Sequence, residues 1–117
     1  IGKETKNICE KEVSDHILGY CIVNDVSERE WQLEKSGQWV KGKSADTFGP
    51  TGLYLVIQDE IHDINNLNLI LEVNGNTMQY GNTKNMIFNV NFLIYYLSKF
   101  MSLQPGDLIT TGTRAGV

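Results

Sequence analysis

Short hydrophobic runs separated by polar turns predict strands along most of the chain. The segment Leu67–Val73 alternates hydrophobic and polar side chains, and the Asn74-Gly75 pair that follows it is typical of a tight hairpin turn. We therefore expect a partner strand over Thr77–Tyr80. Continuous hydrophobic runs predict three further strands, at Tyr20–Val23, Leu53–Ile57 and Leu108–Thr111.

Two other segments repeat hydrophobic residues at helical spacing. Val90–Met101 has them three and four residues apart, which predicts the longest helix of the chain, with Asn89 as its N-cap. Glu10–Ile17 predicts a shorter amphipathic helix that ends at Gly19. His16 falls in its last turn, where the helix dipole favours a cation, and we prefer that interpretation to a catalytic role. The mixture of strands and helices predicts a β-rich α+β fold.

Composition excludes several classes of partner. The chain has 117 residues, which predicts a single domain. Its net charge is −4 without a long block of like charge, so we expect neither nucleic acid nor an anionic membrane surface as a partner. The longest hydrophobic run, around Phe92–Tyr96, is too short to span a bilayer. Cys9 and Cys21 lack the spacing of a metal site, and reduced thiols are favoured over a disulfide.

Asp25 lies where the first predicted strand ends and a helix is expected to begin. Ser27 and Glu30 have the spacing of a capping box, which predicts that the helix begins at Ser27. A carboxylate held between a strand and a helix is well placed for chemistry, although an ordinary turn residue that caps backbone amides has the same position. Hard divalent cations prefer oxygen ligands, chiefly carboxylates and water. Asp25 is therefore a candidate metal ligand.

Other polar residues are candidates for the same site. Lys43 lies in a glycine-containing loop and could stabilise a negatively charged oxygen or move a proton. Gln32 could orient a water or a substrate carbonyl, and Arg29 could bind a substrate carboxylate or form a structural salt bridge. We expect Asp25, Lys43 and Thr111 to converge in the fold. Threonine hydroxyls at loop and strand ends are offered by Thr47 and Thr111.

A series of motifs extends along nearly the whole chain. Residues 19–32 read Gly-Tyr-x-x-x-Asn-Asp-Val-Ser-x-Arg-x-x-Gln, and residues 42–50 read Gly-Lys-Ser-x-x-Thr-Phe-Gly-Pro. Further motifs are Leu-Glu-Val-Asn-Gly at 71–75, Met-Ile-Phe at 86–88, Tyr-Leu-Ser at 96–98 and Pro-Gly-Asp-Leu-Ile-Thr-Thr-Gly-Thr at 105–113. In composition and order this series resembles the fumarylacetoacetate hydrolase family, and specifically the central part of its catalytic domain.

The resemblance implies a role for each candidate residue. It makes Asp25 a ligand of a divalent metal, expected to be Mg²⁺ or else Mn²⁺ or Ca²⁺, with Thr47 close to that metal. It places Lys43 beside the metal and the substrate, as the catalytic residue. The substrate-binding residues would be Gln32 and Thr111, with Arg29 as the candidate for a substrate carboxylate.

The resemblance also implies a fold and a reaction. The fold would be a mixed β-roll, usually assembled as a homodimer, and the substrate a small 3-oxo acid. Family members hydrolyse C–C bonds in substrates of the acylpyruvate and fumarylacetoacetate type, through a metal-bound enolate. The alternatives within the family are isomerisation of a 2-hydroxyhepta-2,4-diene-1,7-dioate-type substrate and decarboxylation of oxaloacetate. The expected location is the cytoplasm, with mitochondria as the alternative.

The sequence departs from the family pattern in three places. The other family metal ligands form a Glu-x-Glu pair just before the Ile-Gly at residues 1–2, and further strands follow residue 117. We therefore expect residues 1–117 to be one partial domain, incomplete at both ends, in which Asp25 alone would hold Mg²⁺ weakly. The family's Gly-Thr-Pro is here Gly112-Thr113-Arg114, which replaces a rigid turn residue by a charge. A truncated, non-catalytic remnant is accordingly an alternative to an enzyme.

Overall fold

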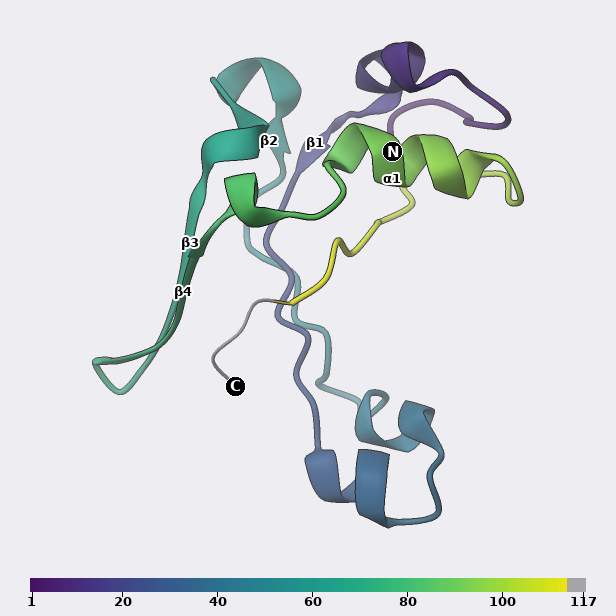
Figure 1. Cartoon of the computed structure of the whole chain (residues 1–117). Coiled ribbons are helices and arrows are strands. Elements are labelled where there is room, and N and C mark those ends of the chain that lie inside the picture. Colours follow the sequence, from purple (N-terminus) through teal and green to yellow (C-terminus); the bar gives the residue numbers. More distant parts are fainter. Residues whose placement is uncertain (114–117) are drawn as a thin grey trace. The chain divides into compact units, whose positions relative to one another are not determined.

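The chain folds into two compact units. The structure, a computed structural model, describes residues 1–113. Arg114, where the family has a proline, lies outside the described residues. Unit 1 combines Ile1–Gly19 with the residues from Val56 onward, and unit 2 is the continuous segment Tyr20–Leu55. The chain thus leaves unit 1 once and returns to it once (Figure 1).

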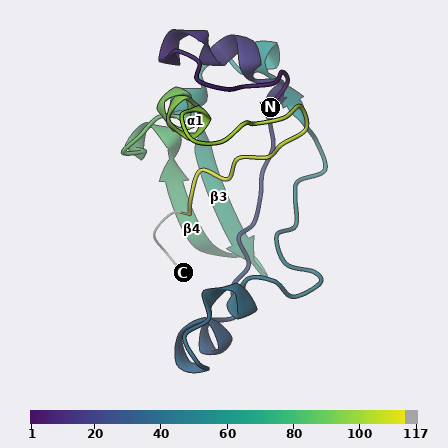
Figure 2. The same cartoon turned by 90° about the vertical axis from the view of Figure 1, so that its right-hand side faces the viewer.

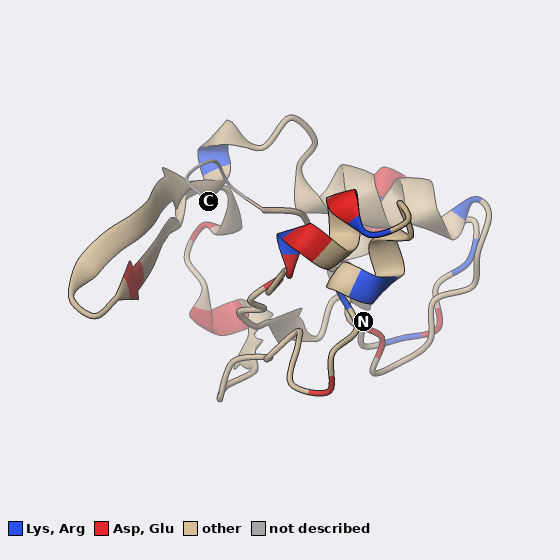
Figure 3. Cartoon of the chain, turned by 90° about the horizontal axis from the view of Figure 1, so that it is seen from below, with Lys and Arg blue, Asp and Glu red and all other residues tan. Residues whose placement is uncertain are grey.

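The predicted hairpin is confirmed in unit 1. Strand β3 (Asn68–Val73) pairs antiparallel with β4 (Asn76–Asn82), and the register shifts between Leu71 and Glu72 (Figure 1). Asn74 and Gly75 have φ angles of 51° and 80°. A two-residue turn of this kind requires positive φ at both positions, which asparagine and glycine tolerate best. The hairpin carries one charged side chain, Glu72, whereas acidic and basic residues intermix along the helical segment Glu10–His16 (Figure 3).

Helix α1 (Val90–Ser98) confirms the predicted long helix and its cap. It is the longest helix of the described residues, and the Asn89 side chain accepts a hydrogen bond from the Phe92 amide at 2.8 Å. The helix ends three residues before the predicted Met101. Its last amides bond to carbonyls only three residues back, as from Lys99 to Tyr96, so the final turn tightens and the regular helix stops.

The helical segment η1 (Glu10–His16) packs against α1, as two views show (Figures 1 and 2). It is a 3₁₀ helix, and it ends in the extended residue Ile17, so the prediction that Gly19 ends it is wrong. Gly19 instead opens strand β1, where a Cβ atom would collide with the backbone carbonyl of Val56. The glycine is needed for a close approach of two backbones and not for a helix end.

The core of unit 1 joins distant parts of the sequence. Val13, Ile94 and Leu103 are its buried hydrophobic residues. Thr5 and Leu103 form an antiparallel bridge, with reciprocal backbone hydrogen bonds of 2.9 and 3.0 Å. The Gly106 amide donates to the Ile1 carbonyl at 3.0 Å. The first and last described segments of the unit are therefore held together by backbone pairing around this core.

Three predicted strands are wrong or too long. Leu108–Thr111 is not a strand, because none of the described segments pairs with it. For Tyr20–Val23 and Leu53–Ile57 the structure has only β1 (Gly19–Tyr20) and β2 (Val56–Ile57), which pair with each other. An isolated bridge, Val23 to Thr51, continues the first segment. The pairing continues one residue further, where the Asn24 amide donates to the Pro50 carbonyl at 3.0 Å, and it ends there because Pro50 has no N–H to donate in return.

The remaining elements are short helical turns. Because they outnumber the strands in the described residues, the mixed α+β content is confirmed but the β-rich balance is not. The part of the chain that the structure describes contains no helix long and apolar enough to cross a membrane. The turns are η2 (Glu30–Glu34), η3 (Trp39–Gly42), η4 (Gln58–Glu60), η5 (Ile64–Asn66) and η6 (Thr83–Asn85).

Candidate functional site

Unit 2 brings Asp25 and Lys43 into direct contact. The Lys43 ammonium donates to the Asp25 carboxylate over 2.7 Å and to the Ser27 hydroxyl over another 2.7 Å. The Lys43 side chain is 27% exposed and the Asp25 side chain 54% exposed. The predicted convergence of these two residues is therefore confirmed. An ion pair that remains open to solvent on the carboxylate side can still receive a ligand.

Close packing of Gly42 against η2 positions Lys43. The Glu28 amide donates to the Gly42 carbonyl at 2.9 Å. A Cβ atom on Gly42 would lie 2.5 Å from the Gln32 Cβ and 2.6 Å from the Glu28 carbonyl oxygen. No side chain fits into such a gap. The missing side chain lets η3 approach η2, and Lys43 follows η3 directly in the chain.

The prediction that Ser27 caps a helix is wrong. The element η2 begins at Glu30, and the Glu28 carboxylate accepts from the amides of Glu30 at 3.2 Å and Trp31 at 2.7 Å. The Ser27 hydroxyl donates instead to the backbone carbonyl of Asp25 at 3.1 Å. It also accepts from Lys43, so both of its hydrogen-bonding functions serve the acid–lysine pair. The glutamate one residue later takes over the cap.

Arg29 and Gln32 form a second polar pair. The Arg29 guanidinium donates to the Gln32 side-chain oxygen at 2.7 Å, so the alternative of a structural salt bridge is not found in the described residues. Gln32 is 1% exposed, and its side-chain NH₂ group has no hydrogen-bond partner among the described atoms. A buried donor without an acceptor costs about 1–3 kcal/mol. The Gln32 side-chain NH₂ group therefore has a free donor for an acceptor, but it is buried and does not contact bulk solvent.

The two predicted threonines belong to different units of the structure. Thr47 belongs to unit 2 but is exposed in the turn that the Phe48 amide closes on Ala45 at 2.8 Å. Thr111 belongs to unit 1, so its convergence with Asp25 and Lys43 stays a prediction.

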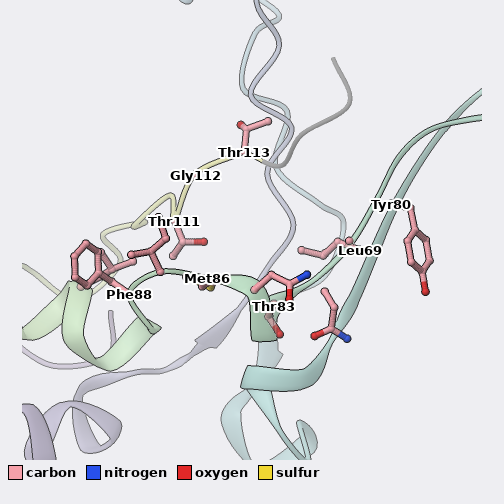
Figure 4. Close-up of a pocket in the computed structure, with 13 residues that line it drawn as sticks. Leu69, Tyr80, Thr83, Met86, Phe88, Thr111, Gly112 and Thr113 are labelled. Atoms are coloured by element: carbon pink, nitrogen blue, oxygen red, sulfur yellow. The ribbon is translucent and has the colours of Figure 1, made fainter.

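Thr111 lines a pocket of about 530 Å³ in unit 1 (Figure 4). The hairpin contributes Leu69 and Tyr80 to its lining, and the segment before α1 contributes Met86 and Phe88 (Figure 4). All residues that line the pocket are uncharged. In this pocket Thr111 could therefore offer a hydroxyl for hydrogen bonding, but no formal charge would attract an anion.

The donor groups of the described residues do not fit a divalent cation by themselves. Residues 1–113 contain no group of three or more His, Cys, Asp or Glu side chains that could hold a metal ion. Asp25 is the one carboxylate of the predicted site, and one of its oxygens is engaged by Lys43. Ca²⁺ takes 6–8 oxygen ligands and Mg²⁺ needs octahedral coordination, so a single shared carboxylate is a poor site for either.

Comparison with known proteins identifies the family. The sequence model of the fumarylacetoacetate (FAA) hydrolase C-terminal family matches residues 1–117. The chain belongs to this hydrolase family. A curated relative from Burkholderia multivorans, whose name assigns it provisionally as a hydrolase, is 57% identical over the whole chain. The chain spans 42% of the length of that relative.

Solved structures of the family match closely in fold. Fumarylacetoacetate hydrolase from Exiguobacterium antarcticum is 36% identical, with a TM-score of 0.92 over 99% of this chain and 41% of that one. The 5-carboxymethyl-2-hydroxymuconate delta-isomerase from Mycobacterium smegmatis is 39% identical, with a TM-score of 0.89 over 99% of this chain and 45% of that one. The 2-hydroxyhepta-2,4-diene-1,7-dioate isomerase from Mycobacterium marinum is 43% identical with the same TM-score, over 99% and 44% of the two chains. The family fold is thus shown.

Two residues of the cluster escaped the sequence analysis. Ser27 was assigned to a helix cap because the spacing to Glu30 fits that role equally well. Gly42 was predicted only as part of the loop that carries Lys43, although a glycine directly before a candidate lysine can also mark a close packing of two backbones. Spacing along one segment cannot distinguish these alternatives, since each depends on a contact with another segment.

Proposed function

We propose that this family member acts on a small 3-oxo acid and hydrolyses a C–C bond in it, as in acylpyruvates and fumarylacetoacetate. The observation that carries the proposal is the contact between Lys43 and Asp25, 2.7 Å long, within the motif series of the family. C–C cleavage of a 3-oxo acid develops negative charge on a carbonyl oxygen. Cationic or N–H donors fixed at that oxygen lower the barrier.

Lys43 is the candidate for that donor. An ammonium has three N–H groups, and Asp25 and Ser27 take two of them. The third is available for a substrate oxygen. Asp25 balances the charge of the lysine and keeps it near the site in the absence of substrate.

Arg29 and Gln32 are the candidates for substrate binding. Arg29 holds the Gln32 side-chain oxygen by its 2.7 Å hydrogen bond, and the buried NH₂ group, which has no partner, could donate to a substrate oxygen once a local movement exposes it. Arg29 could bind a carboxylate with its remaining N–H groups. The proposed roles of Thr47 and Thr111 and a requirement for Mg²⁺ follow from the family resemblance, and Asp25 by itself does not provide the coordination that Mg²⁺ needs.

The test is a set of single substitutions in the protein that carries this sequence. Lys43→Ala and Asp25→Ala are assayed with an acylpyruvate and saturating Mg²⁺, following the loss of substrate absorbance. We expect each to lower kcat by a factor of about 10² or more, because Lys43→Ala removes the donor itself and Asp25→Ala removes the acceptor that holds it in place. Lys41→Ala, next to the same glycine but bonded to Ser36, is the matched control. Wild-type turnover in Asp25→Ala or Lys43→Ala would refute the proposed roles.

Isomerisation is the second candidate, because both isomerase structures share more residues with this chain than the hydrolase structure does, at 39% and 43% against 36%. An isomerase needs the same donors to stabilise an enolate but moves a proton instead of breaking a C–C bond. A 2-hydroxyhepta-2,4-diene-1,7-dioate-type substrate distinguishes the two reactions. Isomerisation leaves the product mass unchanged, hydrolysis gives two fragments, and decarboxylation of oxaloacetate releases CO₂.

A further inference from the structure

The Ser27 hydroxyl lies between Asp25 and Lys43 and has one orientation there. A hydroxyl carries one hydrogen, and that hydrogen is donated to the Asp25 backbone carbonyl at 3.1 Å. The oxygen lone pairs therefore point away from that carbonyl, and one of them accepts from the Lys43 ammonium at 2.7 Å. The backbone thus fixes the hydroxyl, and the hydroxyl in turn fixes the lysine.

We propose that Ser27 is a positioning residue that sets the direction of the Lys43 ammonium, a role that rests on the proposed function of Lys43. Asp25 by itself does not fix that direction. Its side chain is half exposed, and an ion pair in contact with water is weak and does not require one geometry. A lysine side chain has four rotatable bonds and loses considerable entropy when it is held in one conformation. One acceptor leaves the rotation of the Lys43 ammonium open. Two acceptors at 2.7 Å, the Asp25 carboxylate and the Ser27 hydroxyl, fix its orientation.

The consequence concerns the third N–H group of Lys43. With two of its tetrahedral positions occupied by Asp25 and Ser27, the third N–H can point in only one remaining direction. A substrate oxygen in that direction meets a donor that needs no reorganisation. Such preorganisation raises kcat and has little effect on KM, because it matters most when charge develops on the oxygen.

The chain offers a matched control for this hydroxyl. In the same unit, Lys41 donates to the Ser36 hydroxyl at 3.0 Å, but that hydrogen bond is exposed and involves neither Asp25 nor Lys43. Ser27→Ala and Ser36→Ala therefore remove the same chemical group, each from a lysine. Ser27→Thr keeps a hydroxyl at the site of interest.

The experiment has two readouts on the same variants. The first is ¹H–¹⁵N NMR of the lysine ammonium groups in the full chain at one fixed pH, where hydrogen bonds slow exchange with water. The Lys43 signal is expected in the wild type, Ser27→Thr and Ser36→Ala, and is expected to broaden or vanish in Ser27→Ala. The second is steady-state turnover of an acylpyruvate by the protein that carries this sequence. Loss of the positioning contact should lower kcat about tenfold in Ser27→Ala, with KM within about twofold and recovery in Ser27→Thr.

An unchanged Lys43 signal in Ser27→Ala overturns the proposal, as does a kcat within about twofold of the wild type. If Ser27→Ala does not fold, Ser27→Thr and Ser27→Cys test the proposal instead. The thiol of Ser27→Cys is a poor acceptor, so this variant should lose the Lys43 signal and the turnover as predicted for Ser27→Ala, while Ser27→Thr keeps both. If the wild type turns over no substrate while the NMR pattern is as expected, the proposed function fails and the positioning contact stands.

Discussion

Replacing Gly42 by alanine should destabilise unit 2 and displace Lys43. The added methyl group would lie 2.5 Å from the Gln32 Cβ and 2.6 Å from the Glu28 carbonyl oxygen. Neither atom can rotate away, since one is a backbone atom and the other is fixed at the root of a buried side chain. Elements η2 and η3 must therefore separate, which also strains the 2.9 Å hydrogen bond from Glu28 to Gly42.

The expected cost is about 2 kcal/mol. Overpacking a well-packed contact costs about 1–3 kcal/mol, and a strained hydrogen bond adds up to about 1 kcal/mol. In the other direction, alanine restricts the unfolded chain and stabilises the protein by about 0.4–1 kcal/mol where its backbone conformation is allowed. The φ angle of Gly42 is not in the left-handed region, so alanine adds no backbone strain there.

Urea unfolding followed by tryptophan fluorescence reports the free energy of unfolding of unit 2, which contains Gly42. Both tryptophans of the chain, Trp31 and Trp39, lie in unit 2. Gly37→Ala is the matched control, because a Cβ there meets nothing within 4 Å and only its φ of 66° opposes the change. Gly37→Ala should lose about 1 kcal/mol without moving the Lys43 ammonium signal, whereas Gly42→Ala should change both. A Gly42→Ala unfolding midpoint equal to or above that of the wild type would refute the close-packing argument.

Three further measurements test other parts of the structure. Asn89→Ala removes the cap on the Phe92 amide and should cost about 1 kcal/mol in thermal unfolding, while Asn91→Ala inside the same helix should be neutral or stabilising. Partial burial raises the pKa of the Tyr20 phenol above its ordinary value of 10.0, so the stability this group contributes is present below pH 10 and is lost as the pH rises through the folded-state pKa. In Tyr20→Phe, the free energy of unfolding measured with urea should fall less steeply as the pH rises above 10. An unchanged slope of this free energy against pH would contradict the prediction. Calorimetric titration of the chain with Mg²⁺ and Mn²⁺ should show no micromolar binding, and tight binding that disappears in Asp25→Ala would contradict the conclusion that this one carboxylate is a poor cation site.

Local signals were sufficient for the hairpin and for α1. Asn74 and Gly75 adopt positive φ angles largely whatever surrounds them, and the Asn89 side chain reaches an amide only three residues away. The physical cause of both elements lies within a few residues, where a sequence pattern can detect it. The convergence of Asp25 with Lys43 was also predicted, because Asp25 lies at the end of a predicted strand and Lys43 in a glycine-containing loop, where sites commonly form.

Features that depend on distant contacts were not predictable. Ser27 has a suitable spacing for a cap, but Lys43, sixteen residues away, determines what its hydroxyl does. Leu108–Thr111 has the composition of a strand, yet composition cannot supply a partner, and a lone extended segment forms no ladder. The same holds for Gly19 and Gly42, whose role is set by the backbone that each one touches.

The arrangement of the two units has a consequence for the order of events on the ribosome. Unit 2 is one continuous segment, so all of its contacts can form once Leu55 has emerged. The core of unit 1 needs Val13 and Leu103, and the bridge from Thr5 also ends at Leu103. Residues 1–19 therefore cannot complete this core until Leu103 has been translated, by which time most of the described chain has been made. Chaperone demand should fall on residues 1–19 and not on the part that carries Asp25 and Lys43.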